Sequence, residues 1–483
     1  MPLRLNTATG KWVVAATVLG SSMVFLDGTV VNVALPRIGS DFNAGISELQ
    51  WVLNSYLLAL AALILLGGSL GDRFGRKRIF VIGAVWFTAA SALCGLAPSV
   101  EWLVAGRVLQ GVGGALLAPG SLAILEAGFA QADRARAIGI WSGLAGVSTA
   151  IGPPLGGWLV DAVSWRAVFF LNVPLGILVV LVSMRHIPES RDKQLVGRID
   201  YAGAALAVLA LGGISWTLIE GPARGIGDPV VLGALFAGLL ATALFLLRER
   251  RAAEPMLPLG LFSSRTFSAA NLLTFVVYGA FGGALFLLTV LLQTGLGYSP
   301  LVAGLATLPV TVIMLFFSAR SGAVAQRIGP RLPLTVGPLV IAASLLAMHT
   351  IDIDSNYLSG VLPCVVLLAV GLVIVVAPVT ATTLASAPDE RAGVASAVSN
   401  AVSRTGQLFA IALLPALGGL QGNDYDVPGA IVSAFQTAVL FSAVLCAIGA
   451  AIAWRMIDND CLAGPKLSGR VPDPAPHGGS AGG

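Results

Sequence analysis

Two ionisable residues lie deep inside long apolar segments of this 483-residue chain, where charges are costly and usually serve a function. Asp27 follows about fifteen apolar residues, and Arg107 lies about five residues into another apolar run. If the two runs cross a membrane in opposite directions, both side chains lie at similar depth. A carboxylate beside a guanidinium can bind and release a proton, because charge and solvation set its proton affinity. The pair is therefore predicted to couple protons to another process; the alternative is a static ion pair.

The composition shows what kind of scaffold must position these residues. Hydrophobic residues make up 56% of the chain and charged residues 11%, whereas a soluble domain carries about 25% charged residues. The 58 glycines lie largely within the apolar runs, where small residues allow helices to approach closely. The composition predicts an all-α polytopic membrane protein and excludes a set of soluble domains.

Fourteen apolar windows of about 20 residues could each span a bilayer as a helix. They lie at residues 12–34, 50–71, 79–97, 102–127, 138–160, 167–187, 201–219, 229–247, 268–292, 301–321, 332–349, 357–383, 393–420 and 430–456.

The distribution of Lys and Arg predicts the orientation of these spans. With the N-terminus in the cytoplasm, 23 of the 28 basic residues fall in cytoplasmic segments, three fall outside and two lie within helices. Cytoplasmic loops of membrane proteins are enriched in Lys and Arg. We therefore expect both termini in the cytoplasm, which also requires an even number of spans.

Two short motifs recur at nearly the same distance along the chain. The segment 322–331 aligns with 68–77 at an offset of 254 residues, and Glu390-Arg391-Ala392 resembles Asp133-Arg134-Ala135 at an offset of 257. Parallel repeats of this kind are typical of transporters that rock two halves about a central site. The repeat predicts a six-helix bundle in residues 1–190, two inserted helices in 191–255 and a second six-helix bundle in 256–460. The segment 461–483 is rich in Gly and Pro and is predicted to be a disordered tail.

The first copy of the repeat is a dense cationic loop, Gly68-Ser-Leu-Gly-Asp-Arg-Phe-Gly-Arg-Lys-Arg78. Its acid and guanidinium groups could suggest a catalytic cluster, but they lie at the end of a span in a cytoplasmic loop. We interpret them as a gating motif that holds helices together in one conformation. Its residues are Gly68, Asp72, Arg73, Gly75 and Arg76. The second copy has Gln326 in place of Asp72, so the two loops need not be equivalent.

A third feature is a polar stripe in the thirteenth window. Asn400, Arg404 and Gln407 are four and three residues apart, which places them on one helical face. The stripe either lines a cavity or joins helices, and the sequence favours neither reading. The candidate residues for a substrate cavity are Asn32, Asn54, Gln110, Asn400, Arg404 and Gln407.

Other motifs limit the possible chemistry. A G-x-x-x-x-G-K-[ST] loop is missing from the sequence, which excludes ATP-driven transport by this chain alone. The four cysteines are isolated and lack metal-ligand spacing. We expect a protein that is not an enzyme and has no cofactor, metal site or catalytic residue.

Several of these motifs together resemble the fourteen-helix drug:proton antiporter group of the major facilitator superfamily, which includes multidrug and antibiotic exporters of actinobacterial type. The resemblance covers residues 12 to about 455. It rests on the loop at 68–78, the first-helix segment 26–36, the fourth-helix segment 107–114 and the segment 165–176. In that group the arginine corresponding to Arg107 is implicated in proton coupling. Gly152-Pro153-x-x-Gly156-Gly157 resembles the antiporter motif of the fifth helix.

The resemblance implies a proton-coupled antiporter in the cytoplasmic membrane, powered by the proton gradient. The last six windows contain no Asp or Glu, so we expect neutral or monocationic amphipathic substrates such as drugs or antibiotics. The expected partners are these substrates, protons and the lipid bilayer, with no nucleic acid, and the expected state is a monomer. Alternatives are proton-coupled uptake of a nutrient, movement of a lipid or self-made metabolite, or a non-transporting membrane sensor or scaffold.

Overall fold

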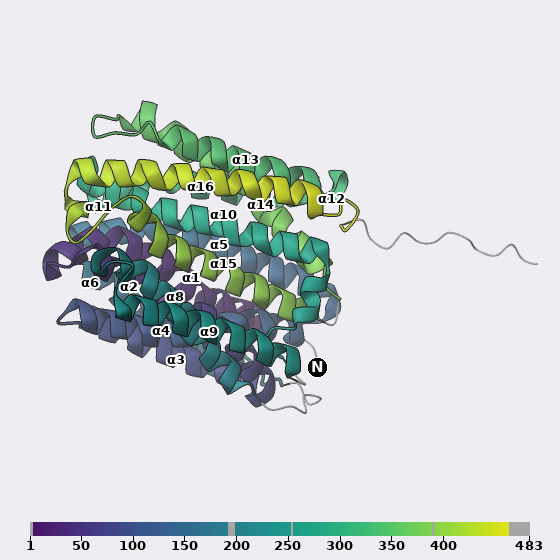
Figure 1. Ribbon diagram of the computed structural model, residues 1–483. Helices are drawn as coiled ribbons and strands as arrows, with labels where there is room; N and C mark the ends of the chain where they lie inside the picture. Colours follow the sequence, from purple (N-terminus) through teal and green to yellow (C-terminus); the bar gives the residue numbers. More distant parts are fainter. Residues whose placement is uncertain (1–2, 192–198, 253–254, 389–390, 463–483) are drawn as a thin grey trace, which may run out of the picture.

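The computed structural model describes residues 3–191, 199–252, 255–388 and 391–462, and within these ranges the fold is helical (Figure 1). The predicted tail falls almost entirely outside the described residues. The first bundle is formed by α1 (Ala8–Phe42), α2 (Ile46–Phe74), α3 (Arg76–Gly95), α4 (Val100–Gly128), α5 (Gln131–Ala162), α6 (Trp165–Phe170) and α7 (Asn172–His186). The short α6 continues into α7, so the bundle consists of six spans.

The second bundle also consists of six spans, two of which begin or end in a short irregular turn and one of which is interrupted between two α-helices. Its elements are α10 (Arg265–Val290) with η2 (Leu291–Gly295), α11 (Pro300–Ala306) with α12 (Leu308–Ile328), α13 (Arg331–Met348), η3 (Tyr357–Val361) with α14 (Leu362–Ala385), α15 (Ala392–Leu417) and α16 (Pro428–Met456). The turns η1 (Leu259–Ser263) and η5 (Asp424–Asp426) lie in the loops before α10 and α16.

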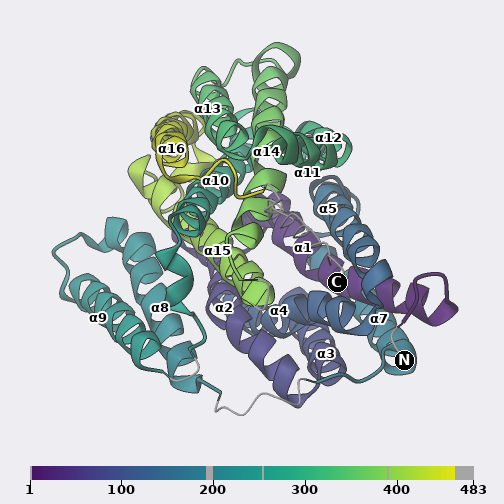
Figure 2. The same cartoon turned by 90° about the vertical axis from the view of Figure 1, so that its right-hand side faces the viewer.

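The two bundles show the same pattern of helix packing, as expected for a repeated unit. In the first bundle α1 packs on α5, α2 on α4, and α3 on α4 and α7; in the second, α10 packs on α15, α12 on α14, and α13 on α14 and α16. Figure 2 shows the two groups of helices end on. The repeat extends to the backbone, because Gly75 and Gly329 both end their helix with φ values of +113° and +85°. Only glycine adopts such angles without strain.

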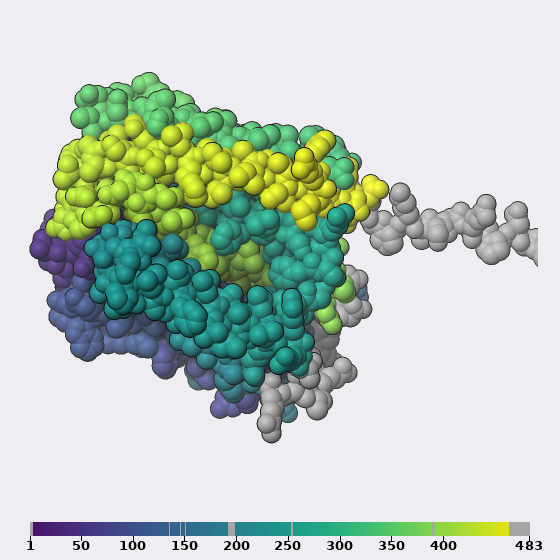
Figure 3. All heavy atoms as spheres, viewed as in Figure 1, coloured from purple at the N-terminus to yellow at the C-terminus, as the bar shows by residue number. Residues whose placement is uncertain are grey.

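The inserted pair lies at the periphery of the two bundles. The helix α8 (Tyr201–Arg224) packs against α2 and α15, so it spans the junction of the two bundles. The helix α9 (Pro229–Arg251) packs mainly on α8 and is otherwise exposed. Trp51 of α2 donates a hydrogen bond to Glu220 of α8 at 3.0 Å. Figure 3 shows the pair against the side of the molecule, with the surface hollowed between α9 and the second bundle.

The described residues contain helical spans at each of the fourteen predicted windows. Twelve are long and apolar enough to cross a membrane by length and composition. The other two are α5 and α15, with 32 and 26 residues. Both contribute charged and polar side chains to an internal cavity, which explains their lower apolarity. The predicted windows were often too short because helix ends extend beyond the hydrocarbon core, as in α1, which continues to Phe42.

Side-chain hydrogen bonds join the two bundles at one end of the molecule. We call the end that carries the α2–α3, α4–α5 and α12–α13 loops and the N-terminus the basic face, and the other end the opposite face. At the opposite face the Gln50 side chain donates to the carbonyls of Ile411 and Ala412 at 2.6 and 3.0 Å, linking α2 to α15. Gln293 donates to the carbonyl of Val33 at 3.0 Å, linking the second bundle to α1. The opposite face is therefore closed in this conformation.

Tyr425 adds a further link across the closed face. Its hydroxyl donates to the carbonyl of Ala44 at 2.9 Å. Burial, followed by the negative charges of Asp426 and Glu48, raises the pKa of Tyr425 to about 12. The phenol therefore stays protonated and keeps this hydrogen bond throughout the neutral pH range.

The orientation gives a prediction that two matched glycines test. Gly227 lies in the α8–α9 loop and Gly260 in the loop before α10, and a Cβ atom at either position meets open space. In a Cys461→Ser background, Gly227→Cys should react with an impermeant thiol reagent added to intact cells, and Gly260→Cys should stay unlabelled until the cells are opened. The reverse pattern of labelling would place the basic face outside.

Candidate functional site

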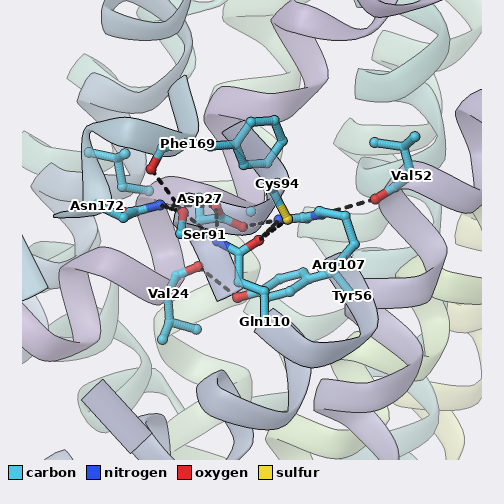
Figure 4. A network of polar contacts seen from close by, with 12 residues as sticks. Val24, Asp27, Val52, Tyr56, Ser91, Cys94, Arg107, Gln110, Phe169 and Asn172 are labelled. Atoms are coloured by element: carbon cyan, nitrogen blue, oxygen red, sulfur yellow. Dashed lines mark hydrogen bonds and ion pairs between the residues drawn. The ribbon is translucent and has the colours of Figure 1, made fainter. Parts of the chain in front are cut away.

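The two deep charges predicted from the sequence meet inside the first bundle. Asp27 of α1 and Arg107 of α4 form an ion pair, and their side chains are 0% and 1% exposed (Figure 4). Gln110, one turn after Arg107, accepts from the guanidinium at 2.7 Å and donates to the carboxylate at 2.7 Å. Asn172 of α7 donates to the same carboxylate at 3.2 Å. Helices α1, α4 and α7 therefore converge on one carboxylate.

The guanidinium is held as firmly as the carboxylate. Arg107 Nε donates to the carbonyl of Val52 at 3.0 Å, and its Cζ lies 4.2 Å from the centre of the Tyr56 ring. Tyr56 in turn donates to the carbonyl of Val24 at 3.1 Å. A planar guanidinium can satisfy several acceptors and stack on an aromatic ring at once, which an ammonium cannot do.

Ser91 of α3 joins the network behind the carboxylate. Its hydroxyl accepts from Gln110 at 3.1 Å and from Asn172 at 3.0 Å, and donates to the carbonyl of Phe169 at 2.9 Å. The Asp27 carboxylate thus accepts hydrogen bonds from three side chains, and an ionised carboxylate can only accept. The arrangement fits the ionised form of Asp27. Loss of that charge would leave Arg107 buried without its counter-charge.

A cavity of about 720 Å³ lies between the two bundles. Its wall includes residues at helix ends on the basic face, such as Asp72, Glu126 and Arg134, and residues at mid-membrane depth, such as Phe25 and Arg404. It therefore opens at the basic face and ends near the middle of the molecule. Phe25 is two residues before Asp27, so the buried ion pair lies directly behind the inner end of the cavity.

The six residues proposed for a substrate cavity divide into two groups in the structure. Asn400 and Arg404 are on the cavity wall. Gln110 belongs to the buried network, Gln407 packs beside Gly282, and the Asn32 amide donates to the Gly28 carbonyl at 3.3 Å. Asn54 is completely buried, and both polar atoms of its side chain lack a hydrogen-bond partner within the described ranges.

Three of the five residues of the predicted gating motif, Gly68, Asp72 and Arg76, line this cavity. Asp72 accepts from Arg76 at 2.8 and 2.7 Å, which links the end of α2 to the start of α3. Gly68 is also on the wall, and Arg73 lies in the last turn of α2. At Gly75 a Cβ atom would clash with the carboxylate of Glu189, which accepts from the backbone N–H of Lys77 at 3.1 Å.

The corresponding position in the second bundle has a neutral partner. A Cβ atom at Gly329 would clash with the side-chain amide of Asn459, and the Asn459 oxygen accepts from the backbone N–H of Arg331 at 3.3 Å. A residue after the last helix of each bundle therefore caps the third helix of that bundle. A carboxylate at a helix N-terminus is favoured by the helix dipole. The two caps differ in charge, because Glu189 is acidic and Asn459 is neutral.

The glycines of the fifth-helix motif allow α5 to pack on both bundles. Gly152 and Gly156 lie against Thr29 and Val30 of α1. On the other side Gly157 lies against the carbonyl of Pro300, and the carbonyl of Pro153 lies against Gly304. Asp161 then accepts from Ser299 and from the backbone of Leu301, both at 2.9 Å. The motif is therefore a second junction between the bundles near the opposite face.

This junction predicts the effect of one added methyl group. Gly157→Ala places a Cβ atom against backbone atoms of α11, so the opposite face should close less readily and the population should shift toward conformations that are open there. A cysteine at Ala412, in the closed α2–α15 junction, should then be labelled faster by an impermeant reagent from the opposite side. The matched control is Gly146→Ala in the same helix, where a Cβ atom meets open space. Equal labelling in the two variants would contradict this role.

Sequence reasoning missed three parts of the buried network: Ser91, Asn172 and Tyr56. Asn172 lies in the segment 165–176 that carries part of the family resemblance, and a polar amide in an apolar run was a usable signal. Ser91 and Tyr56 give no comparable signal, because serine and tyrosine are common in membrane helices. Gln110 was placed in the substrate cavity because the sequence alone could not tell which side of α4 faces Asp27.

Two repeated helical bundles around a cavity that opens at one end are the architecture of a polytopic membrane transporter. The chain belongs to the Major Facilitator Superfamily, because the model of that family matches residues 17–411.

Several similar proteins are named as resistance or export proteins. The chain is 41% identical over 410 residues to the tetracenomycin C resistance and export protein of Streptomyces glaucescens, covering 85% of this chain and 76% of that protein. It is 34% identical to the methylenomycin A resistance protein of Bacillus subtilis, covering 88% and 91%. It is 32% identical to the multidrug efflux pump LfrA of Mycolicibacterium smegmatis, covering 95% and 92%.

Solved structures share the fold. A D-xylose-proton symporter matches with a TM-score of 0.66 at 16% identity, covering 93% of this chain and 98% of that chain. A bacterial homologue of the human lysosomal transporter Spinster, in an inward-facing and occupied conformation, matches with a TM-score of 0.65 at 17% identity, covering 93% and 97%. At these identities the likeness shows the fold alone.

Proposed function

We propose that this protein is a proton-coupled antiporter of the cytoplasmic membrane that exports amphipathic small molecules, such as antibiotics and other drugs, by alternating access. The observation that carries the proposal is the Asp27–Arg107 pair, buried directly behind the inner end of a cavity that opens at the basic face. Export is supported by the names of the relatives, which include resistance and export proteins. The basic face is the cytoplasmic one and holds both termini, and the working unit is the monomer.

The proposed cycle begins in the conformation described above. Substrate enters the cavity from the cytoplasm while Asp27 is ionised and paired with Arg107. The bundles then rock, the junctions at Gln50 and Gly157 open, and substrate leaves on the other side. A proton from outside neutralises Asp27 and weakens its hold on Arg107, because the attraction between opposite charges is lost. The bundles return, the pair forms again, and the proton is released to the cytoplasm.

A pump-deficient bacterial host tests export directly. Cells that express this chain should grow at higher concentrations of some toxic amphipathic compounds, and should hold less of a fluorescent compound until the proton gradient is collapsed by an uncoupler. The matched control is the Gly157→Ala variant, which should reach the membrane but confer less resistance. Increased sensitivity and accumulation across the panel would instead indicate uptake.

A further inference from the structure

The cavity contains one cation that the proposed proton cycle does not use. Arg404 is the thirteenth residue of the 26-residue helix α15, so it lies about 18 Å from the basic end of that helix. It is on the cavity wall. Its guanidinium lies 5.6 Å from the centre of the Phe25 ring of α1, across the cavity from its own helix. Within the described ranges it has neither an ion-pair partner nor a hydrogen-bond acceptor.

The other charges of the wall do not balance Arg404. Asp72 is paired with Arg76 at the mouth, where Glu126 and Arg134 also lie, near the ends of α4 and α5. The remaining deep acid, Asp27, is fully buried and committed to Arg107. The described inner part of the cavity therefore has an excess of one positive charge. Five guanidinium N–H groups in a region of reduced dielectric favour an anionic partner, because an unpaired charge is costly there.

The surroundings of Arg404 define the rest of such a partner. Phe25 and Tyr278 bring aromatic rings to the inner cavity, and Leu60 and Ile64 of α2 supply apolar surface. Thr274 is on the same wall, but its hydroxyl already donates to the carbonyl of Ala270 at 2.8 Å. The inner cavity thus combines one strong hydrogen-bond donor group with ring-stacking and apolar surface.

We infer that Arg404 is the primary substrate-recognition residue and that it selects aromatic substrates with an acidic group, such as a carboxylate or an ionised phenol. The planar fork of the guanidinium binds a carboxylate through two parallel hydrogen bonds, and the same positive charge disfavours protonated amines. This inference rests on the proposed function and names its substrate class. It departs from the expectation of neutral or monocationic substrates, because Asp27 is paired with Arg107 and is not available to attract a cation.

The competing role for Arg404 is structural, because its contact with Phe25 joins the two bundles. A structural role would affect all ligands alike, whereas recognition depends on the charge of the ligand. Two xanthene dyes separate these roles, since fluorescein is anionic and rhodamine 6G is cationic on nearly the same ring system. Binding of each dye to the purified full-length protein can be followed by fluorescence polarisation at mildly alkaline pH.

The wild-type protein should bind fluorescein more tightly than rhodamine 6G. Arg404→Gln should weaken fluorescein binding about tenfold to a hundredfold, the range expected for a charged hydrogen bond, and leave rhodamine 6G binding unchanged or tighter. The affinity of Arg404→Lys for fluorescein should lie between those of the wild type and Arg404→Gln, because lysine keeps the positive charge but lacks the planar guanidinium. The matched control is Arg320→Gln, since Arg320 of α12 also lies over a phenylalanine ring, that of Phe317 at 5.5 Å, but is not on the cavity wall.

Each outcome of the dye-binding experiment either supports or overturns the role of Arg404 in substrate recognition. Tighter binding of rhodamine 6G by the wild type, or equal losses for both dyes in Arg404→Gln, would overturn the inference. If Arg404→Gln does not fold, as judged by its thermal unfolding, the wild-type dye preference and the Arg404→Lys variant still decide. Export of cationic but not anionic compounds would refute the substrate class and leave the proposed export intact. Charge-selective binding without export of any compound would refute the proposed function and leave the binding site intact.

Discussion

Asp27→Asn will abolish transport driven by a pH gradient while leaving substrate exchange in the absence of a gradient. Asparagine has nearly the shape of aspartate but cannot bind and release a proton. The Asp27 carboxylate is completely buried. It is held by the guanidinium of Arg107, the amide of Gln110 from α4 and the amide of Asn172 from α7. In proteoliposomes, uphill accumulation of a labelled substrate should fall to the level of liposomes without protein.

The control for this variant is a second acid in the same helix. Asp41 accepts from Trp165 at 2.8 Å near the opposite face, and Asp41→Asn should keep most of the gradient-driven transport. Undiminished accumulation by Asp27→Asn would move the proton site elsewhere. Glu126, on the cavity wall near the end of α4, would then be the next candidate.

Arg107→Ala should have the second largest effect, because it leaves the Asp27 carboxylate buried without its counter-charge. Removing one partner of a buried pair costs about 3–5 kcal/mol of stability. A carboxylate that loses its cationic neighbour also keeps its proton to higher pH. Residual transport by this variant should therefore reach half of its maximum at a higher pH than in the wild type, which initial rates over a pH series will show.

Arg107→Lys separates charge from geometry. An ammonium restores the positive charge, but it cannot bond to Val52, Gln110 and Asp27 in one plane while stacking on Tyr56. Partial recovery of the rate, with a pH midpoint closer to the wild type, is expected. If Arg107→Ala had wild-type rates and an unchanged pH midpoint, the pair would be a structural ion pair.

Most of the fold could be predicted because the membrane imposes simple rules. The lengths of the apolar segments predicted the membrane-spanning windows. The Lys and Arg residues in the loops predicted the direction in which each window crosses the membrane. The meeting of Asp27 with Arg107 followed from depth counting in antiparallel helices. The depth of a residue in the membrane does not specify which way its side chain faces around the helix axis. For that reason Gln110 and Gln407 were grouped with the cavity residues on sequence alone. The three-residue spacing of Arg404 and Gln407 allows one to face the cavity while the other packs beside Gly282.

The inserted helices illustrate a second limit of sequence reasoning. The repeat identifies α8 and α9 as extra to both bundles but does not say where they pack. The structure places α8 across the α2–α15 junction, where Trp51 and Gln421 donate to Glu220 and to the carbonyl of Pro222, at 3.0 and 3.4 Å. These contacts connect residues too far apart in sequence for any local pattern to indicate them.

Proton movement linked to substrate movement is the most direct test of the central claim. Proteoliposomes that contain the wild-type protein and an internal pH indicator can be loaded with substrate and diluted into substrate-free buffer. Outward substrate movement should drive protons inward and acidify the interior, and Asp27→Asn should abolish the acidification. Substrate release without a pH change, or with protons leaving in the same direction as substrate, would contradict proton-coupled antiport.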